Sequence, residues 1–314
     1  MTEKLFVNFF IDCEATQPAL KDPALGERAS EGFADVLEAH ELRGTFHVIP
    51  SDLEASPQLY RHLAQRGHEI GLHIHPAADG YEEFLGVYGP QEQHEIISQA
   101  ASRFAQVMGF RPATFCPGYG SANDHTYGVL YELGFRHGMT AIPTRVLPEC
   151  CSIHAGAPLD VHYAHRHNRV LVGDLDFVEI PLTVDPDSRL WGGKHPLDLR
   201  VELVDAKNHW YTTKKAVDRQ VAGKTPVKII RGVTHNTFEY SQPGDFRRQT
   251  LVQMIHHIRT IAEAAELQMV PATADQIASA YRSAVPLGSA TTRLTLDRRA
   301  YAKPATQPRE RSMS

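Results

Sequence analysis

Residues 66–76 read Arg-Gly-His-Glu-Ile-Gly-Leu-His-Ile-His-Pro, and this stretch joins the end of a helix to a buried strand. Upstream, Ser56 and Pro57 are typical of the first positions of a helix, and Gly67 is typical of a helix end. The largely apolar run that follows predicts a strand over 68–75. A helix followed directly by a buried strand is the repeating unit of a parallel α/β fold.

The same alternation of strand and helix continues along the chain. Apolar runs predict strands over residues 5–12, 44–49, 113–119, 178–184 and 227–233, with a short one near 269. Apolar residues at helical spacing predict helices around residues 33–40, 97–108, 124–134, 246–265 and 277. Repeated strand–helix units imply parallel strands with helices outside, either as a closed barrel or as a doubly wound sheet.

Three segments depart from this repeat. Residues 143–170 are rich in His, Pro and Cys, and we expect them to cover the barrel mouth. Residues 186–224 contain Trp191 and Trp210 and are predicted to form an insert. Residues 286–314 form a polar, basic tail, so we expect a single domain over 1–285 followed by that tail.

Composition excludes several classes of protein. The chain has 314 residues and a formal net charge of −5, which argues against a nucleic-acid partner. The first apolar run stops at Asp12, too early for a membrane-spanning helix or a signal-peptide core. The four cysteines, none in a CxxC pair, are Cys13, Cys116, Cys150 and Cys151. Reduced thiols and a cytoplasmic location are therefore expected.

Ionisable residues gather at three predicted strand ends, where active sites of parallel α/β proteins lie. Asp12 and Glu14 end the first strand and His73 and His75 the third, while His235 ends a late one. Residues two apart on a strand share a face, so each pair can point to one place. A carboxylate with two imidazoles is a familiar catalytic zinc set. The alternatives are carboxylates that cap neighbouring helices and histidines that are only exposed polar decoration.

At these residues the sequence resembles the polysaccharide-deacetylase, or NodB-like, family. Residues 66–73 resemble the approach to its metal-histidine motif, residues 10–14 its first motif and residues 115–124 its third, which lines the groove. The resemblance implies a distorted seven-stranded β/α barrel that hydrolyses N-acetyl or related amide bonds, usually on sugars. It also implies roles for individual residues: Asp12 as the base, Glu14 and His73 as metal ligands, and His235 as the acid.

The chain departs from the family pattern at three places. The second metal histidine usually lies four residues after the first, where this chain has Ala77, so His75 is the predicted replacement. Cys116 stands where an arginine usually pairs with the base, which removes a force that lowers the pKa of the base. Trp191 is the candidate for the tryptophan of the fourth motif. Cys116, Tyr119 and Trp191 are thus the predicted substrate-side residues.

The sequence therefore predicts a metal-dependent amide hydrolase, in the first place a carbohydrate N-deacetylase. The predicted metal site is Glu14, His73 and His75, with Zn²⁺ as the expected ion and a small molecule or oligosaccharide as substrate. Two alternatives stay open: a hydrolase of a non-sugar amide such as a ureide or cyclic imide, and a degraded relative that only binds a glycan or protein. Cys116 and Ala77 favour the degraded relative, and the retained carboxylates and histidines oppose it.

Overall fold

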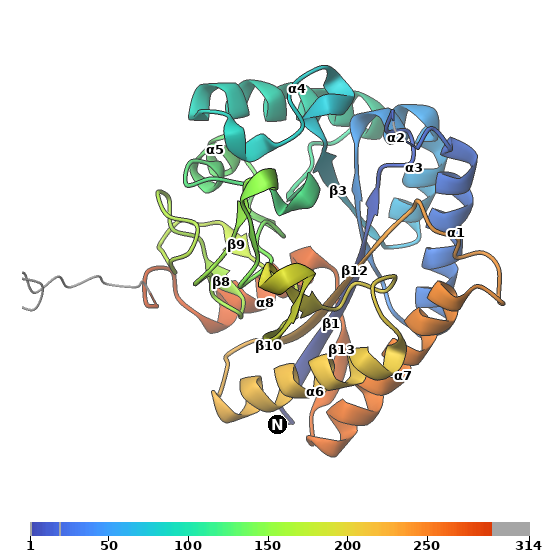
Figure 1. Cartoon of the computed structure of the whole chain (residues 1–314), viewed down its shortest axis with the longest axis vertical. Helices are drawn as coiled ribbons and strands as arrows, with labels where there is room; N and C mark the ends of the chain where they lie inside the picture. Colours follow the sequence, from blue (N-terminus) through green and yellow to red (C-terminus); the bar gives the residue numbers. More distant parts are fainter. Residues whose placement is uncertain (1, 19, 291–314) are drawn as a thin grey trace, which may run out of the picture.

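A computed structural model describes residues 2–18 and 20–290, and it shows parallel strands surrounded by helices (Figure 1). Among the described residues one curled sheet has nine strands. Seven of them run parallel in the order β12 (Lys228–His235), β1 (Lys4–Cys13), β2 (Thr45–Val48), β3 (Glu69–Ile74), β4 (Thr114–Pro117), β5 (His137–Gly138) and β9 (Val178–Glu179). A further strand, β13 (Gln268–Pro271), pairs parallel with β1, and β8 (His162–Tyr163) pairs antiparallel with β9. The predicted distorted seven-stranded β/α barrel is confirmed.

Helices form the outer layer of the molecule (Figure 1). In chain order they are α1 (Pro23–Ala39), α2 (Pro50–Ala55), α3 (Pro57–Gln65), α4 (Pro90–Met108), α5 (Thr126–Glu132), α6 (Ala206–Ala222), α7 (Phe246–Ala264) and α8 (Ala274–Ala284). Short strands complete the structure: β6 (Val146–Leu147), β7 (Ser152–Ile153), β8 (His162–Tyr163), β10 (Val184–Leu190), β11 (His195–Asp198) and β13 (Gln268–Pro271). Among the described residues, no helix has both the length and the apolar character needed to span a bilayer.

Strand β1 shows how residue alternation builds both the core and the site. Leu5, Val7, Phe9 and Ile11 belong to the main hydrophobic core, which also contains residues of the surrounding helices. The residues between them face the barrel interior, where Phe10 packs against Cys116. A central parallel strand is buried on both faces, so its apolar run is nearly continuous. The same alternation places Asp12 at the interior end of the strand.

The barrel is distorted at two edges. Along one edge of β1, residues 4–7 pair with β13 and residues 10–13 pair with β2. Between β9 and β12 there is no regular strand pairing among the described residues. Instead, Thr183 donates its backbone N–H to Arg231, and Leu199 donates to Thr183 and accepts from Val233. We call this irregular junction, residues 183 and 199–201, the seam.

Some predicted details differ from the structure. Helix α2 was not predicted, because its six residues are too few to show a helical period. The strand expected over 178–184 is interrupted: its first two residues form β9, Thr183 belongs to the seam, and Val184 begins β10. Ser56 is the N-cap of α3, but its side chain accepts no capping hydrogen bond. The segment expected as an insert holds the β10–β11 hairpin and α6, which lies beside α7 (Figure 1). Most of the predicted tail, from residue 291, lies outside the described residues.

Candidate active site

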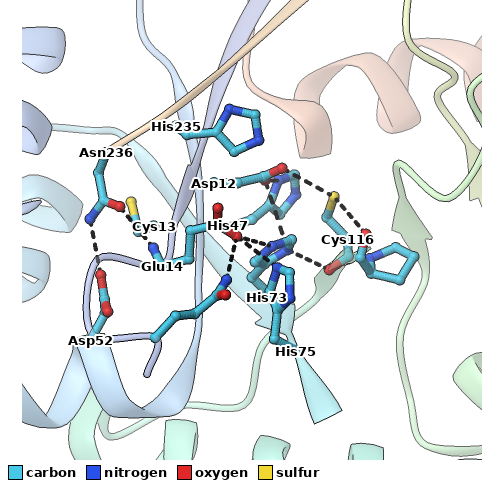
Figure 2. Close-up of polar contacts among 12 residues, drawn as sticks. Asp12, Cys13, Glu14, His47, Asp52, His73, His75, Cys116, His235 and Asn236 are labelled. Atoms are coloured by element: carbon cyan, nitrogen blue, oxygen red, sulfur yellow. Dashed lines mark hydrogen bonds and ion pairs between the residues drawn. The ribbon is translucent and has the colours of Figure 1, made fainter. Parts of the chain in front are cut away.

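Two carboxylates from the end of β1 enter the site at different depths. Asp12 is almost fully buried inside the barrel, whereas Glu14 lies just beyond the strand. The backbone N–H of Glu14 donates to Asn236 at 2.8 Å, and the Asn236 amide donates to Asp52 at 2.9 Å (Figure 2). Asp52 also accepts the N–H groups of Ala15 and Thr16. The turn after β1 is thus fixed by hydrogen bonds, and the Glu14 carboxylate is held toward β3.

Two imidazoles from the end of β3 face the Glu14 carboxylate. The Nε2 atoms of His73 and His75 lie 3.4 and 2.7 Å from Glu14 Oε2 (Figure 2). His73 Nδ1 donates to the carbonyl oxygen of Cys116 at 2.7 Å, and His75 Nδ1 contacts the carboxylate of Glu83. Because those acceptors hold the Nδ1 protons, both Nε2 atoms face one place, where each would offer a lone pair to a bound metal ion.

This arrangement fits a divalent metal ion. Ligand atoms of Glu14, His73 and His75 all lie within 4.8 Å of one another. Histidine ligands in metal sites almost always donate their second N–H to a carbonyl or carboxylate, as both do here. Burial lowers the pKa of His75, but the carboxylates of Glu14 and Glu83 outweigh it and raise that pKa to about 9. A bound cation would balance the same negative charge, so the predicted ligand set fits a divalent cation in both geometry and charge.

Asp12 lies beside Glu14, His73 and His75, but the Nε2 atoms of the two histidines face Glu14 and not Asp12. Its Oδ1 is 3.5 Å from His47 Nδ1 and 3.8 Å from His73 Nδ1, and it has no hydrogen-bond partner among the described residues. Burial raises the pKa of Asp12, but His73 and His47 together bring it below its ordinary value. The Asp12 carboxylate is therefore ionised at neutral pH, although Cys116 stands where the family usually has an arginine to pair with it. An ionised carboxylate that lines the cavity is suited to accept a proton.

Cys116 faces Asp12, with its Sγ 3.9 Å from Asp12 Oδ2. The two residues and His73 form a second group whose atoms could hold a metal. Burial raises the pKa of the Cys116 thiol well above its ordinary value, and the Asp12 carboxylate raises it further. Since a thiol binds metals as thiolate, this second group is the poorer site.

His235 lies at the end of β12, in register with Asp12 (Figure 2). Its Nδ1 donates to Glu202 at 2.6 Å, and 21% of its side chain is exposed. Burial lowers the pKa of His235, but Glu202 outweighs it and raises that pKa to about 9. The imidazole is thus protonated at neutral pH and can donate a proton toward the site.

A cavity of about 140 Å³ joins these groups. Its lining includes the predicted Asp12, Glu14, His73, His75, Tyr119 and His235, together with Pro117, Gly120, Met139, Ile142, Arg145, Leu182, Arg200 and Val233. Cys116 is fully buried beside Asp12 and does not line the cavity. Trp191 is half-exposed, stacks on His195 and lies outside this lining. Contact of Cys116 or Trp191 with substrate stays a prediction that this cavity does not support.

Sequence reasoning missed five residues of the site. These are His47, Glu83, Arg145, Arg200 and Glu202. A signal existed for His47, since it lies in a predicted strand and shares the face of Thr45. No periodic pattern relates the other four to the residues that they contact.

Replacement of Gly118 by alanine tests the metal site without removing a ligand. A Cβ at Gly118 would lie 2.5 Å from Cε1 and 2.6 Å from Nε2 of His75, so the imidazole must move. We expect Gly118→Ala to weaken zinc binding by about 10–100-fold, as displaced ligand supports do. Gly244→Ala is the control, because nothing lies within 4 Å of its added Cβ. Equal zinc affinities, measured by competition with a chelating dye, would contradict the placement of His75.

Comparison with known proteins gives a family match over part of the chain. Residues 22–138 match the model of the polysaccharide deacetylase family, which confirms the resemblance seen in the sequence. The matched segment includes His73, His75 and Cys116. The peptidoglycan-N-acetylglucosamine deacetylase PgdA of Listeria monocytogenes is 27% identical over 104 residues, which are 32% of this chain and 21% of PgdA. The chain thus matches about a fifth of the length of that curated relative.

Solved structures share the fold over most of the chain. One is assigned as a polysaccharide deacetylase from Mycobacterium smegmatis, with a TM-score of 0.62 and 18% identity, covering 94% of this chain and 96% of that one. Another is Puue allantoinase, with a TM-score of 0.58 and 14% identity, covering 90% and 91%. At these identities the likeness shows a common NodB-like barrel.

Proposed function

We propose that this chain, with its polysaccharide-deacetylase match over residues 22–138, is a metal-dependent hydrolase of an N-acetyl or related C–N amide bond. One observation carries the proposal: the Nε2 atoms of His73 and His75 converge on the Glu14 carboxylate, in a cavity that the Asp12 carboxylate also lines. A carbohydrate N-deacetylase is the first candidate, because the family match points to it. The cytoplasmic location remains a prediction.

Each proton in the proposed hydrolysis has a residue to carry it. Water adds to the amide carbonyl, the C–N bond breaks, and an acid and an amine are released. A divalent ion held by Glu14, His73 and His75 would supply Lewis acidity and a lower pKa for water. Asp12, whose carboxylate lines the cavity, would accept the proton of the attacking water. His235, held by Glu202, would donate its proton to the departing nitrogen.

Replacement of Glu202 by glutamine tests His235 as the acid. Without the Glu202 charge, burial dominates, so the pKa of His235 should fall from about 9 toward or below its ordinary value. The protonated imidazole is the active form, and activity is lost as pH rises through this pKa. We therefore expect the basic limb of the pH dependence of kcat/KM to move to lower pH in Glu202→Gln. An unmoved basic limb would show that His235 is not the acid.

The function itself is tested by metal content and by a substrate panel. Purified protein should contain about one zinc per chain, and it should release acetate from N-acetyl sugars or open the ring of cyclic ureides or cyclic imides to give the corresponding acid. Chelation should remove this activity and added zinc should restore it. The competing interpretation, a degraded relative that only binds, predicts no turnover of any panel member by zinc-loaded protein. Full activity after chelation would overturn metal dependence.

A non-sugar amide is the second candidate substrate, and the cavity favours it. Its volume of about 140 Å³ is small beside the roughly 300–1,000 Å³ of sites for drug-sized ligands. Apolar side chains of Met139, Ile142, Leu182 and Val233 line part of it. A compact substrate, or one compact end of a larger one, suits this space.

A further inference from the structure

Two arginines line the same cavity as the proposed metal ligands. Arg145 lies on the loop after β5 and is 3% exposed, and its Nη1 donates to the Tyr119 carbonyl at 2.6 Å. Arg200 lies in the seam, and its backbone forms a bridge beside Val233 of β12. The Arg200 side chain is 18% exposed. Both guanidinium groups are therefore held by the barrel and open onto the cavity.

Neither guanidinium has a carboxylate within hydrogen-bond distance among the described residues. The Nε atoms of Arg145 and Arg200 are buried without a hydrogen-bond partner among the described residues. No carboxylate of the described residues lies within 4.0 Å of the Arg145 guanidinium, by contrast with Arg66, Arg103 and Arg219. Burial and the nearby Arg200 charge lower the pKa of Arg145 to about 10. An anion that entered the cavity would offer both guanidinium groups an acceptor for donors that have none in the protein.

The carboxylates nearest to the Arg200 guanidinium accept hydrogen bonds from other groups. Asp198 and Glu202 are 3.6 and 4.0 Å from the Arg200 guanidinium, beyond hydrogen-bond distance. Asp198 accepts from His195 at 3.0 Å and from the backbone N–H of Arg200 at 3.2 Å. Glu202 accepts from His235 at 2.6 Å and from Thr234 at 2.9 Å. Arg200 therefore keeps donors for a group that enters the cavity.

We propose that the substrate carries a carboxylate close to its scissile amide, and that Arg145 and Arg200 bind this carboxylate. The position of the amide toward Glu14, His73 and His75 rests on the proposed function, but anion binding by the arginines does not. Guanidinium groups bind carboxylates with charge-assisted, directional hydrogen bonds. The substrate class is then a small N-acyl or N-carbamoyl acid. Its carbon skeleton would pack against the apolar side chains of the cavity, Met139, Ile142, Leu182 and Val233.

Binding of matched acids and amides tests the inference without requiring turnover. The probes are N-acetylglycine with N-acetylglycinamide, and N-carbamoylglycine with its amide, which differ in charge and hardly in shape. We expect wild-type protein to bind each acid about tenfold or more tightly than its amide, the effect of one charge-assisted hydrogen bond. Calorimetry on zinc-loaded and chelated protein separates the arginines from the metal, since only the arginine contribution survives chelation.

Variants assign the preference to the arginines. Arg200→Gln should abolish the preference for the acid while leaving the affinity for the amide unchanged, and Arg200→Lys should retain part of it. Arg145→Gln should act in the same direction, with circular dichroism to confirm that the buried change leaves the fold intact. Arg259→Gln, an exposed change on α7, is the matched control and should alter nothing.

The outcomes distinguish this inference from the proposed function. Equal binding of acid and amide by wild-type protein, or no binding of either acid, overturns the inference. Equal loss of acid and amide binding in Arg200→Gln also overturns it, because it would make Arg200 only a support for Glu202. Acid preference without any hydrolysis leaves the inference standing and counts against the function. Hydrolysis of neutral N-acetyl sugars by a protein that shows no preference for the acids would support the proposed function and overturn the inference.

Discussion

Asp12→Asn is expected to retain its zinc while losing about 10²–10⁴-fold in kcat, the usual contribution of a general base. Asparagine keeps the shape of the side chain but cannot accept the proton of water. The metal should stay, because Glu14, not Asp12, faces the Nε2 atoms of both histidines. Metal content and kcat would be measured on the same preparation. Asp218→Asn, an exposed change on α6, is the control and should leave both quantities unaltered.

Loss of zinc from Asp12→Asn would contradict this assignment. It would move Asp12 into the ligand set, where the group of Asp12, His73 and Cys116 offers a second metal geometry. Retained zinc with retained kcat would instead remove Asp12 from the reaction. The two results call for different revisions, so the paired measurement is decisive.

His75→Ala is expected to reduce zinc content from about one per chain to a small fraction and to abolish turnover. The variant leaves one imidazole and one carboxylate, and structural or catalytic zinc sites need at least three protein ligands. Glu83 would also lose its partner, so a negative charge would remain without the ion or the imidazole. Elemental analysis after dialysis measures the loss. His94→Ala, an exposed histidine on α4, is the matched control.

Full zinc occupancy in His75→Ala would overturn the predicted ligand set. A double variant with Cys116→Ser would then show whether the ion had moved to the second group beside Asp12. Rescue of zinc binding in His75→Ala by free imidazole would strengthen the assignment, because the cavity left by the ring faces Glu14.

The barrel could be predicted because its strands and helices carry strong local patterns. Strands β1 and β12 are buried along most of their length and read as apolar runs, and α4 ends at Gly109 in a left-handed conformation. Helix α2 and the seam could not be predicted in this way. The first is too short to show a period, and the second is held by hydrogen bonds between segments far apart in the chain.

The candidate site was predictable where two residues of one strand act together. Asp12 with Glu14, and His73 with His75, follow from the two-residue period of a strand. The supporting residues come from loops instead: Glu83 lies eight residues after His75, and Glu202 lies 33 before His235. No local pattern encodes such pairings, because the folded barrel brings them together. Arg145 and Arg200 were missed for the same reason.

The seam divides the site into a rigid half and a compliant half. Glu14, His73 and His75 extend from strands that are paired on both sides in the sheet, whereas Arg200 and Glu202 lie on or next to a junction with few backbone hydrogen bonds. Segments with fewer such bonds open locally at lower free energy. Local opening along the seam would therefore displace Arg200 and Glu202 together, while Glu14, His73 and His75 stay in place. We expect a product to leave the cavity on that side, without disturbing the proposed metal ligands.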